Sequence, residues 1–133
     1  MIFERDLYPP ILLYLRENGF NYYEEVKFLT RQIDIIGKKE KKIIAIEIKV
    51  SNWQRALQQA LTCRLCADES YIAISEKYSH RVKLELLKEY GIGLIIVKEN
   101  EMEIVQKAKK SKIIHTTIIK KMLQEIEGRK IDS

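Results

Sequence analysis

At residues 43–50 the chain reads IIAIEIKV, an apolar run interrupted by one acid, Glu47, and one base, Lys49. Side chains two positions apart on a strand point to the same side of a sheet. The isoleucines at even positions and Val50 therefore share one face, and Glu47 and Lys49 share the other. Two ionisable groups in a buried strand are costly unless they are paired or bind an ion. The stretch predicts a central strand that carries a functional site.

Residues 32–38 are expected to form the preceding strand, in which Asp34 lies on the opposite face from Ile33 and Ile35. A turn over residues 37–40 should join the two strands into a hairpin. Asp34 and the acid of the next strand would then come within reach of one cation.

The periodicity of the rest of the chain predicts one α/β domain over residues 1–133, with a mixed central sheet flanked by helices. The residues 51–54 have the form of a capping box that opens a helix after the central strand. The strand after that helix should lie parallel to the central strand. The expected elements are a helix from about residue 6 or 7 to 18, strands at 22–29, 32–38 and 42–50, a helix at 53–67, a strand at 69–74, a helix at 79–90, strands at 93–98 and 102–105, and a C-terminal helix at about 116–127.

Composition excludes few classes of protein. No apolar run approaches the roughly 18 residues of a membrane span, and the first residues lack the pattern of a signal peptide. A soluble, cytoplasmic protein without a membrane partner is therefore expected. The formal net charge of +5 and the pI of about 9.1 suit a polyanionic partner, but such values are also common in lysine-rich soluble proteins.

Cys63 and Cys66 form a lone C-x-x-C pair late in the predicted second helix. A zinc site would need two more ligands, which His80 and His115 do not offer at the usual spacing. A redox pair usually lies at a helix N-terminus, where the dipole stabilises a thiolate. We therefore expect both cysteines to pack as small buried hydrophobic residues.

The residues on the two strands suit Mg²⁺, which prefers oxygen ligands and is held by one or two carboxylates together with water and substrate phosphate. Asp34 and Glu47 would be the ligands, and the carbonyl of Ile48 could add a third oxygen. Lys49 could orient a water molecule or stabilise developing charge. The sequence thus predicts hydrolysis of a nucleic-acid backbone with Mg²⁺, for which Mn²⁺ should substitute.

These residues resemble the motif of the PD-(D/E)xK nuclease superfamily, an acid on the second strand and an acid-x-lysine on the third. Asp34, Glu47 and Lys49 match it, and Glu4 stands where many members have a glutamate in the first helix. Ile33 replaces the proline of the motif, a departure that many members share. The resemblance implies a restriction endonuclease-like core with the order α-β-β-β-α-β and a Mg²⁺-dependent endo- or exonuclease activity.

A narrower resemblance is to uncharacterised prokaryotic members that begin with Glu-x-Asp-Leu-Tyr-Pro-Pro, found here at residues 4–10. RecB-like nucleases also place a glutamine of the following helix in the site, which implies a role for Gln59, with Gln58 as the alternative. Holliday-junction resolvases are similar in size and act as dimers, so DNA repair or recombination and a homodimer are further expectations. The resemblance covers residues 4–74.

Simpler interpretations stand beside these. Glu47 and Lys49 could form an ion pair on an exposed sheet face, although Ile43 and Ala45 on that face argue against it. Glu4 could be a solvated terminal acid, and Gln59 an ordinary polar residue on a helix flank. The basic residues 107–112 should form a solvated loop, whereas four lysines near the hairpin are better candidates for DNA backbone contacts, namely Lys38, Lys39, Lys41 and Lys42.

Two other functions therefore remain open from the sequence. One is a non-catalytic module that uses this fold to bind nucleic acid or a protein. The other is an assembly role through the apolar face of the C-terminal helix, which would make a dimer that depends on residues after 116.

Overall fold

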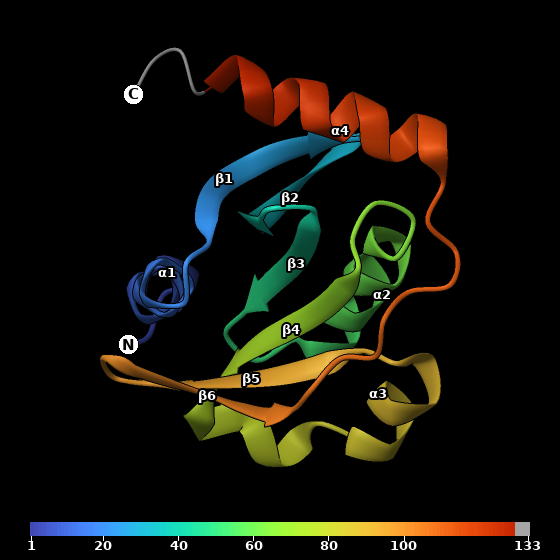
Figure 1. Ribbon diagram of the computed structural model, residues 1–133. Helices are drawn as coiled ribbons and strands as arrows, with labels where there is room; N and C mark the ends of the chain where they lie inside the picture. Colours follow the sequence, from blue (N-terminus) through green and yellow to red (C-terminus); the bar gives the residue numbers. More distant parts are fainter. Residues whose placement is uncertain (130–133) are drawn as a thin grey trace.

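The computed structural model describes residues 1–129, which form a six-stranded mixed sheet with helices on both faces (Figure 1). Within those residues, every helix is too short or too polar to cross a bilayer. The elements in chain order are the 3-10 helix η1 (Glu4–Leu7), α1 (Tyr8–Glu17), β1 (Asn21–Phe28), β2 (Arg31–Lys39), β3 (Lys42–Lys49), α2 (Trp53–Cys63), β4 (Glu69–Ser75), the 3-10 helix η2 (Glu76–Arg81), α3 (Leu84–Tyr90), β5 (Gly93–Lys98), β6 (Glu101–Gln106) and α4 (Thr116–Arg129).

The strands lie in the sheet in the order in which they occur in the chain. β1, β2 and β3 form an antiparallel meander, β4 and β5 continue the sheet in parallel, and β6 returns antiparallel to β5. The predicted meander and the parallel pairing of β3 with β4 are confirmed, and the two strands predicted at residues 93–98 and 102–105 pair as a hairpin. β3 and β4 are therefore central strands, and buried residues fill both of them.

Alternate residues of β3 point to opposite faces of the sheet, and an apolar cluster fills each face. Ile44, Ile46 and Ile48 pack beneath α1. Ile43 and Ala45 point to the other face, in a cluster that includes Cys63 at the end of α2 and Met122 and Ile126 of α4, the helix that packs on β1 (Figure 1). A third cluster lies between the sheet and helices α2 and α3. The predicted division of β3 into two faces is confirmed for these residues.

The second helix is shorter than predicted, because it ends at Cys63 rather than near Ala67. The cause is Asp68, whose carboxylate accepts a hydrogen bond from the Ile43 N–H at 2.8 Å, while its own N–H donates to the Ile43 carbonyl at 2.8 Å. These bonds fix the chain against the start of β3, so the helix must end before it. The cap also differs from the prediction, since the side chain of Asn52 accepts from the Arg55 N–H.

The predicted helix over residues 79–90 is divided into η2 and α3. Val82 and Lys83 between them have extended backbone angles. With the helix interrupted here, Tyr78 and Val82 both pack against the apolar cluster beneath α2. The sequence pattern did not reveal the break, because the apolar spacing on either side of it still fits a helix.

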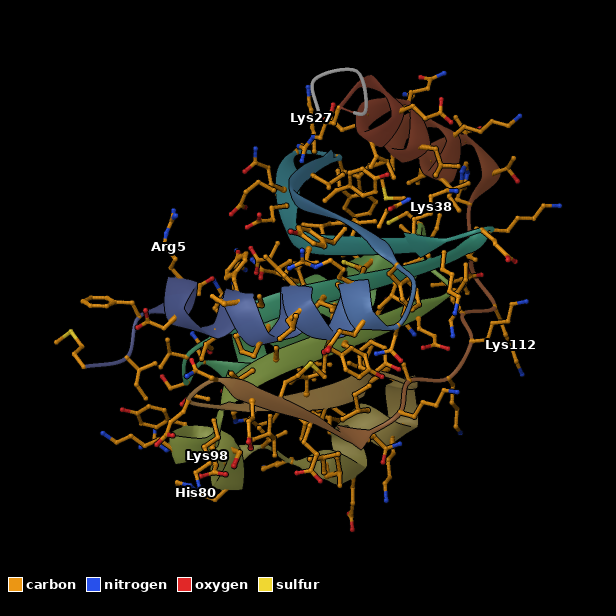
Figure 2. All side chains as sticks on the ribbon, turned by 60° about the vertical axis from the view of Figure 1, so that its left-hand side comes forward. Arg5, Lys27, Lys38, His80, Lys98 and Lys112 are labelled. Atoms are coloured by element: carbon orange, nitrogen blue, oxygen red, sulfur yellow. The ribbon has the colours of Figure 1, made fainter. Side chains whose placement is uncertain are left out.

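The lysines near the β2–β3 turn lie at the other end of the hairpin from the carboxylates, and their contact with DNA stays a prediction. The turn consists of Glu40 and Lys41, whereas Asp34 and Glu47 lie toward the open end of the hairpin. Glu40 follows Asp34 by six positions, about 20 Å at 3.3 Å per residue. In Figure 2, Lys38 projects at the end of the molecule opposite to Arg5.

The close pairing of β4 and β5 depends on a glycine. A Cβ at Gly93 would lie 2.3 Å from the ring of Tyr71 and 2.8 Å from the backbone nitrogen of Ala108. Tyr71 cannot move freely, because it is buried and its hydroxyl donates to Glu69 at 2.8 Å. We therefore expect Gly93→Ala to lower the free energy of unfolding by about 2 kcal/mol through overpacking, as measured by urea denaturation.

The matched control is Gly128→Ala in α4, where a Cβ would meet nothing within 4 Å. Replacing a glycine in the last turn of a helix should leave stability unchanged or raise it by up to about 1 kcal/mol. Equal effects of the two substitutions would contradict the packing argument at Gly93.

Candidate functional site

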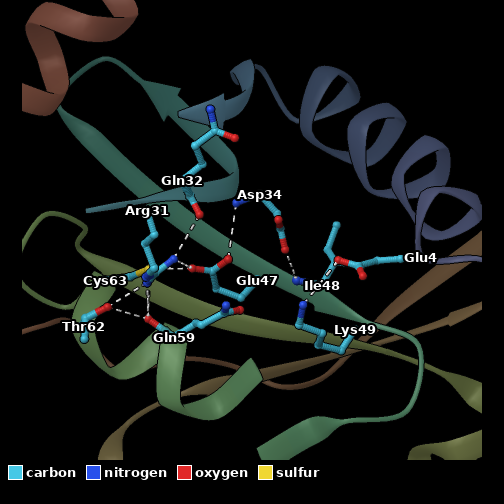
Figure 3. Close-up of polar contacts among 10 residues, drawn as sticks. All are labelled: Glu4, Arg31, Gln32, Asp34, Glu47, Ile48, Lys49, Gln59, Thr62 and Cys63. Atoms are coloured by element: carbon cyan, nitrogen blue, oxygen red, sulfur yellow. Dashed lines mark hydrogen bonds and ion pairs between the residues drawn. The ribbon is translucent and has the colours of Figure 1, made fainter. Parts of the chain in front are cut away.

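The site lies where the ladder between β2 and β3 opens. Regular pairing ends at Ile35 and Ile46, so Asp34 lies opposite Glu47 just beyond it. Side chains there take the place of backbone partners (Figure 3). The Ile48 N–H donates to Oδ2 of Asp34 at 2.7 Å, and the Asp34 N–H donates to Oε1 of Glu47 at 3.3 Å. The two predicted acids are thus brought together across the gap.

Asp34 also marks a break in the alternation of β2. Ile35 packs beneath α1, whereas Ile33 packs in the cluster beneath α4, so the expectation that they share a face is wrong. The facing residue of β1, Glu25, has a φ of 50°, and the pair that it would form with Asp34 is missing from the ladder. Since non-glycine residues rarely adopt this backbone conformation, it indicates a local kink. The kink explains why strict alternation fails here.

Glu47 is a buried acid with an arginine partner. Its side chain is 1% exposed, and its Oε2 lies 2.5 Å from Nη1 of Arg31, the first residue of β2. The other guanidinium nitrogen, Nη2, donates to the carbonyl of Gln59 and to Oγ1 of Thr62, both at 2.7 Å. The ion pair therefore joins β3 to the C-terminal turn of α2. The alternative of an ion pair between Glu47 and Lys49 on an exposed face is wrong.

Burial sets the protonation of this acid. Desolvation raises the pKa of Glu47, the charge of Arg31 lowers it and the charge of Asp34 raises it, so that the net value is about 7. A carboxyl group with a pKa near neutrality, in a gap beside a second carboxylate, is typical of functional sites.

Lys49 and Glu4 meet at the edge of the same gap. Nζ of Lys49 lies 3.8 Å from Oε1 of Glu4, and both side chains are partly exposed. Glu4 occupies the first residue of η1, a single 3-10 turn that continues directly into α1. Partial burial raises the pKa of Glu4, and Lys49 lowers it. Glu4 is thus placed beside the lysine of the motif rather than free in solvent.

Of the two glutamines, Gln59 is the one on the side of α2 that faces β3. Gln58 is exposed and contacts Arg55 on its own helix. The side chain of Gln59 points from the helix toward β3 in Figure 3, while its carbonyl accepts from Arg31. The preference for Gln59 over Gln58 agrees with this geometry, although its contact with Arg31 is made by the backbone.

Cys63 and Cys66 are both free and buried, which confirms that part of the prediction. Cys63 is nevertheless not an ordinary core cysteine. Its Sγ lies 3.4 Å from Oε2 of Glu47 and 3.5 Å from Nη2 of Arg31. Burial raises the pKa of the Cys63 thiol well above its ordinary value, and the charge of Glu47 acts in the same direction. A neutral thiol can donate weakly to the carboxylate.

The open side of the gap is acidic. Glu4, Glu24, Glu25 and Asp34 line a cavity of about 710 Å³, together with Tyr8 of α1. The hydroxyl of Tyr8 lies 3.4 Å from Oε1 of Glu25. Burial raises the pKa of Tyr8, and the charges of Asp34 and Glu25 add to this effect. Tyr8 therefore stays protonated at neutral pH and can donate a hydrogen bond into the cavity.

The donor set fits a hard divalent cation with few protein ligands. Within residues 1–129, no group of three or more His, Cys, Asp or Glu side chains is arranged to hold a metal. Two carboxylates remain, Asp34 and Glu47. A strand residue directs its N–H and its carbonyl toward the same neighbouring strand, so the Ile48 carbonyl faces the gap as well. Such a set suits Mg²⁺, which keeps several waters, better than a metal that needs a complete protein cage.

Sequence reasoning missed two side chains of this site, Arg31 and Thr62. No local pattern marks Arg31, because its contacts with α2 cross 28 and 31 residues of sequence. A signal did exist for Cys63, which lies four residues after Gln59 and therefore on the same side of the helix.

Comparisons with known proteins give a fold but no family. Neither the scan against family models nor the search of curated proteins finds a match. Among solved structures, the chain is similar to the SPO1766 protein of unknown function from Silicibacter pomeroyi, with a TM-score of 0.77 and 21% identity over 99% of this chain and 88% of that one. SfsA of Pyrococcus furiosus, solved in complex with Ca²⁺, matches with a TM-score of 0.41 and 15% identity over 80% of this chain and 61% of its own, too weakly to assign a fold or a function. The chain therefore has the fold of the Silicibacter pomeroyi protein over nearly its whole length.

Proposed function

We propose that this protein is a metal-dependent nuclease that hydrolyses phosphodiester bonds, with DNA as the expected substrate and Mg²⁺ or Mn²⁺ as the cofactor. The observation that carries the proposal is that Asp34 and Glu47 lie opposite each other at the open end of the β2–β3 ladder. The backbone nitrogen of Asp34 lies 3.3 Å from Oε1 of Glu47. Lys49 follows two residues later on the same strand. This is the arrangement that the motif of the PD-(D/E)xK superfamily requires.

Each residue has a role in this reaction. Asp34 and Glu47 would hold the ion, with the Ile48 carbonyl as a further ligand. A bound Mg²⁺ supplies a more acidic water and neutralises charge on the phosphodiester. The ammonium of Lys49 would orient the attacking water or stabilise developing negative charge, and Glu4 would position that ammonium from 3.8 Å. Gln59 would contribute a polar side chain from α2.

The order of the elements supports the same proposal. A helix, three antiparallel strands, a helix and a parallel strand follow one another from η1 and α1 through β4. This order is that of the restriction endonuclease-like core, which we propose as the specific fold. A role in DNA repair or recombination, a cytoplasmic location and a homodimer stay predictions.

A second candidate is a non-catalytic module that binds nucleic acid or a protein. It is favoured by the structural partners that both acids already have, Ile48 for Asp34 and Arg31 for Glu47. Such contacts would hold the strands without an ion. This candidate predicts salt-sensitive binding of DNA in EDTA and no metal-dependent cleavage.

The acids can be tested with isosteric amides, Asp34→Asn and Glu47→Gln. Asp34→Asn keeps an oxygen that accepts from the Ile48 N–H, so its fold should persist while the charge is lost. Glu47→Gln has one oxygen for two donors, Arg31 and the Asp34 N–H, so thermal unfolding must first show that this variant is folded. We expect each substitution to lower the rate of cleavage of duplex, single-stranded or junction DNA in Mg²⁺ or Mn²⁺ by about 10³-fold.

The control for these variants is Glu85→Gln, an exposed glutamate of α3. It should cleave like the wild type. The proposal fails if the wild-type protein cuts none of the three DNAs, or if both amide variants cut as fast as the wild type.

Lys49 should act on the reaction rather than on the metal. We expect Lys49→Gln to reduce cleavage by about 10²-fold, as for the loss of one group that stabilises developing charge. Binding of Mn²⁺, measured by calorimetry, should not weaken. The matched control is Lys98→Gln, because Lys98 also pairs with a glutamate, Glu76 at 3.6 Å, but lies on β5, two strands away from β3. A parallel loss of Mn²⁺ binding in Lys49→Gln would contradict this role.

The pKa of Glu47 predicts how metal binding depends on pH. This pKa is raised from its ordinary value to about 7, so the carboxyl is mostly protonated below pH 7. It must lose its proton to bind a cation. The dissociation constant for Mn²⁺ should therefore rise about tenfold for each pH unit below 7 and level off above about pH 8. Calorimetry between pH 5.5 and 8.5 measures this, and equal affinity at both extremes would show that Glu47 does not titrate as stated.

A further inference from the structure

Arg31 binds one of the two oxygens of Glu47 closely, while the other oxygen has only a longer contact. Its Nη1 lies 2.5 Å from Oε2, on the side where Cys63 also approaches. Oε1 has a weaker contact, 3.3 Å from the Asp34 N–H. The guanidinium is itself held by α2, through the carbonyl of Gln59 and Oγ1 of Thr62. It cannot follow a moving carboxylate without breaking these bonds.

Asp34 shows the same division between its oxygens. Oδ2 accepts a hydrogen bond from the Ile48 N–H at 2.7 Å. Each acid of the gap therefore has one oxygen committed to the protein, Oδ2 in Asp34 and Oε2 in Glu47. A cation would bind Oδ1 of Asp34 and the weakly hydrogen-bonded Oε1 of Glu47.

We propose that Arg31 is a positioning residue that restricts Glu47 to a single coordinating oxygen and thereby makes the site selective for Mg²⁺ and Mn²⁺ over Ca²⁺. The inference rests on the proposed function, since it concerns the cation of the same site. Ca²⁺ takes six to eight oxygens and commonly binds carboxylates through both oxygens, whereas Mg²⁺ accepts single oxygens in an octahedron completed by water. Glu47 could serve Ca²⁺ with both oxygens only by giving up Arg31.

A purely structural role for Arg31 predicts something different. Arg31 also compensates a buried charge, and its removal could destabilise the fold or raise the pKa of Glu47. Those effects would change the affinities for Mn²⁺ and Ca²⁺ by the same factor, because both ions carry the same charge and need the same deprotonated acid. Changes in stability or in the pKa of Glu47 therefore cancel in the ratio of the two dissociation constants. The ratio then depends only on how many oxygens the site offers to the ion.

The experiment measures the dissociation constants of Mn²⁺ and Ca²⁺ by calorimetry at pH 8.5, in the wild type and in three variants. Arg31→Met removes the guanidinium and should lower the preference for Mn²⁺ over Ca²⁺ by about tenfold. Arg31→Lys keeps a cation that can hold Oε2 and should retain most of the preference. Arg55→Gln, on the exposed side of α2, is the matched control and should leave the ratio unchanged.

Thr62→Val replaces Arg31→Met in this measurement if Arg31→Met does not fold. It removes the hydroxyl that accepts from Nη2 at 2.7 Å and so loosens the guanidinium without deleting it. We expect a smaller fall in the preference, about threefold. Thermal unfolding of every variant identifies those that are folded.

The outcomes separate the two proposals. A lower ratio in folded Arg31→Met, or in Thr62→Val where Arg31→Met does not fold, supports the role of Arg31. Mn²⁺ binding with an unchanged ratio in the folded variant overturns that role and leaves the metal site intact. A wild type that binds neither ion overturns the metal site, and the inference about Arg31 with it.

Discussion

The structure depends on the burial of one carboxylate. Glu47 lies in a central strand and is 1% exposed, an environment in which an unpaired charge would cost several kcal/mol. Arg31 compensates it at 2.5 Å and is bound in turn by Gln59 and Thr62. The C-terminal end of a helix favours a cation, because its last carbonyls lack partners within the helix. One interaction therefore neutralises the acid of β3, caps α2 and sets where that helix lies on the sheet.

The same region lacks the backbone pairing that holds the rest of the sheet. Beyond Ile35 and Ile46, the ladder is replaced by hydrogen bonds from backbone N–H groups to the carboxylates of Asp34 and Glu47. Removing either acid would leave a buried N–H without its partner, which costs about 1–3 kcal/mol. The acids are therefore part of the sheet as well as candidates for chemistry. This double role explains why Asp34→Asn, which keeps an oxygen to accept from the Ile48 N–H, is a cleaner test than truncation.

Alternation along β3 was enough to predict its two faces, and the turn residues were enough to predict the hairpin that brings Asp34 opposite Glu47. Both depend on local backbone geometry, which a short stretch of sequence specifies. The contacts of Arg31 could not be predicted in this way, since they form only once α2 lies across the open end of the hairpin. The end of α2 was misplaced for a similar reason, because Asp68 stops it through bonds to a residue 25 positions earlier, Ile43. Long-range polar contacts thus determine the partners of Arg31 and the end of α2, neither of which the periodicity of the sequence specifies.

Charge around the gap limits how a polyanion can approach it. The net charge of +5 suggests attraction, yet the cavity beside Asp34 is lined by three glutamates, and the lysines near the β2–β3 turn lie at the other end of the hairpin. Tyr8 and Arg5 are the groups there that can donate a hydrogen bond to a phosphate. Without a divalent cation, a phosphodiester at the gap would face several negative charges at close range, where screening by salt is least effective. A cation held by Asp34 and Glu47 would reverse the local sign. In the proposed reaction, substrate binding at the gap should therefore depend on the metal as strongly as cleavage does, whereas binding at the distant lysines should depend only on salt.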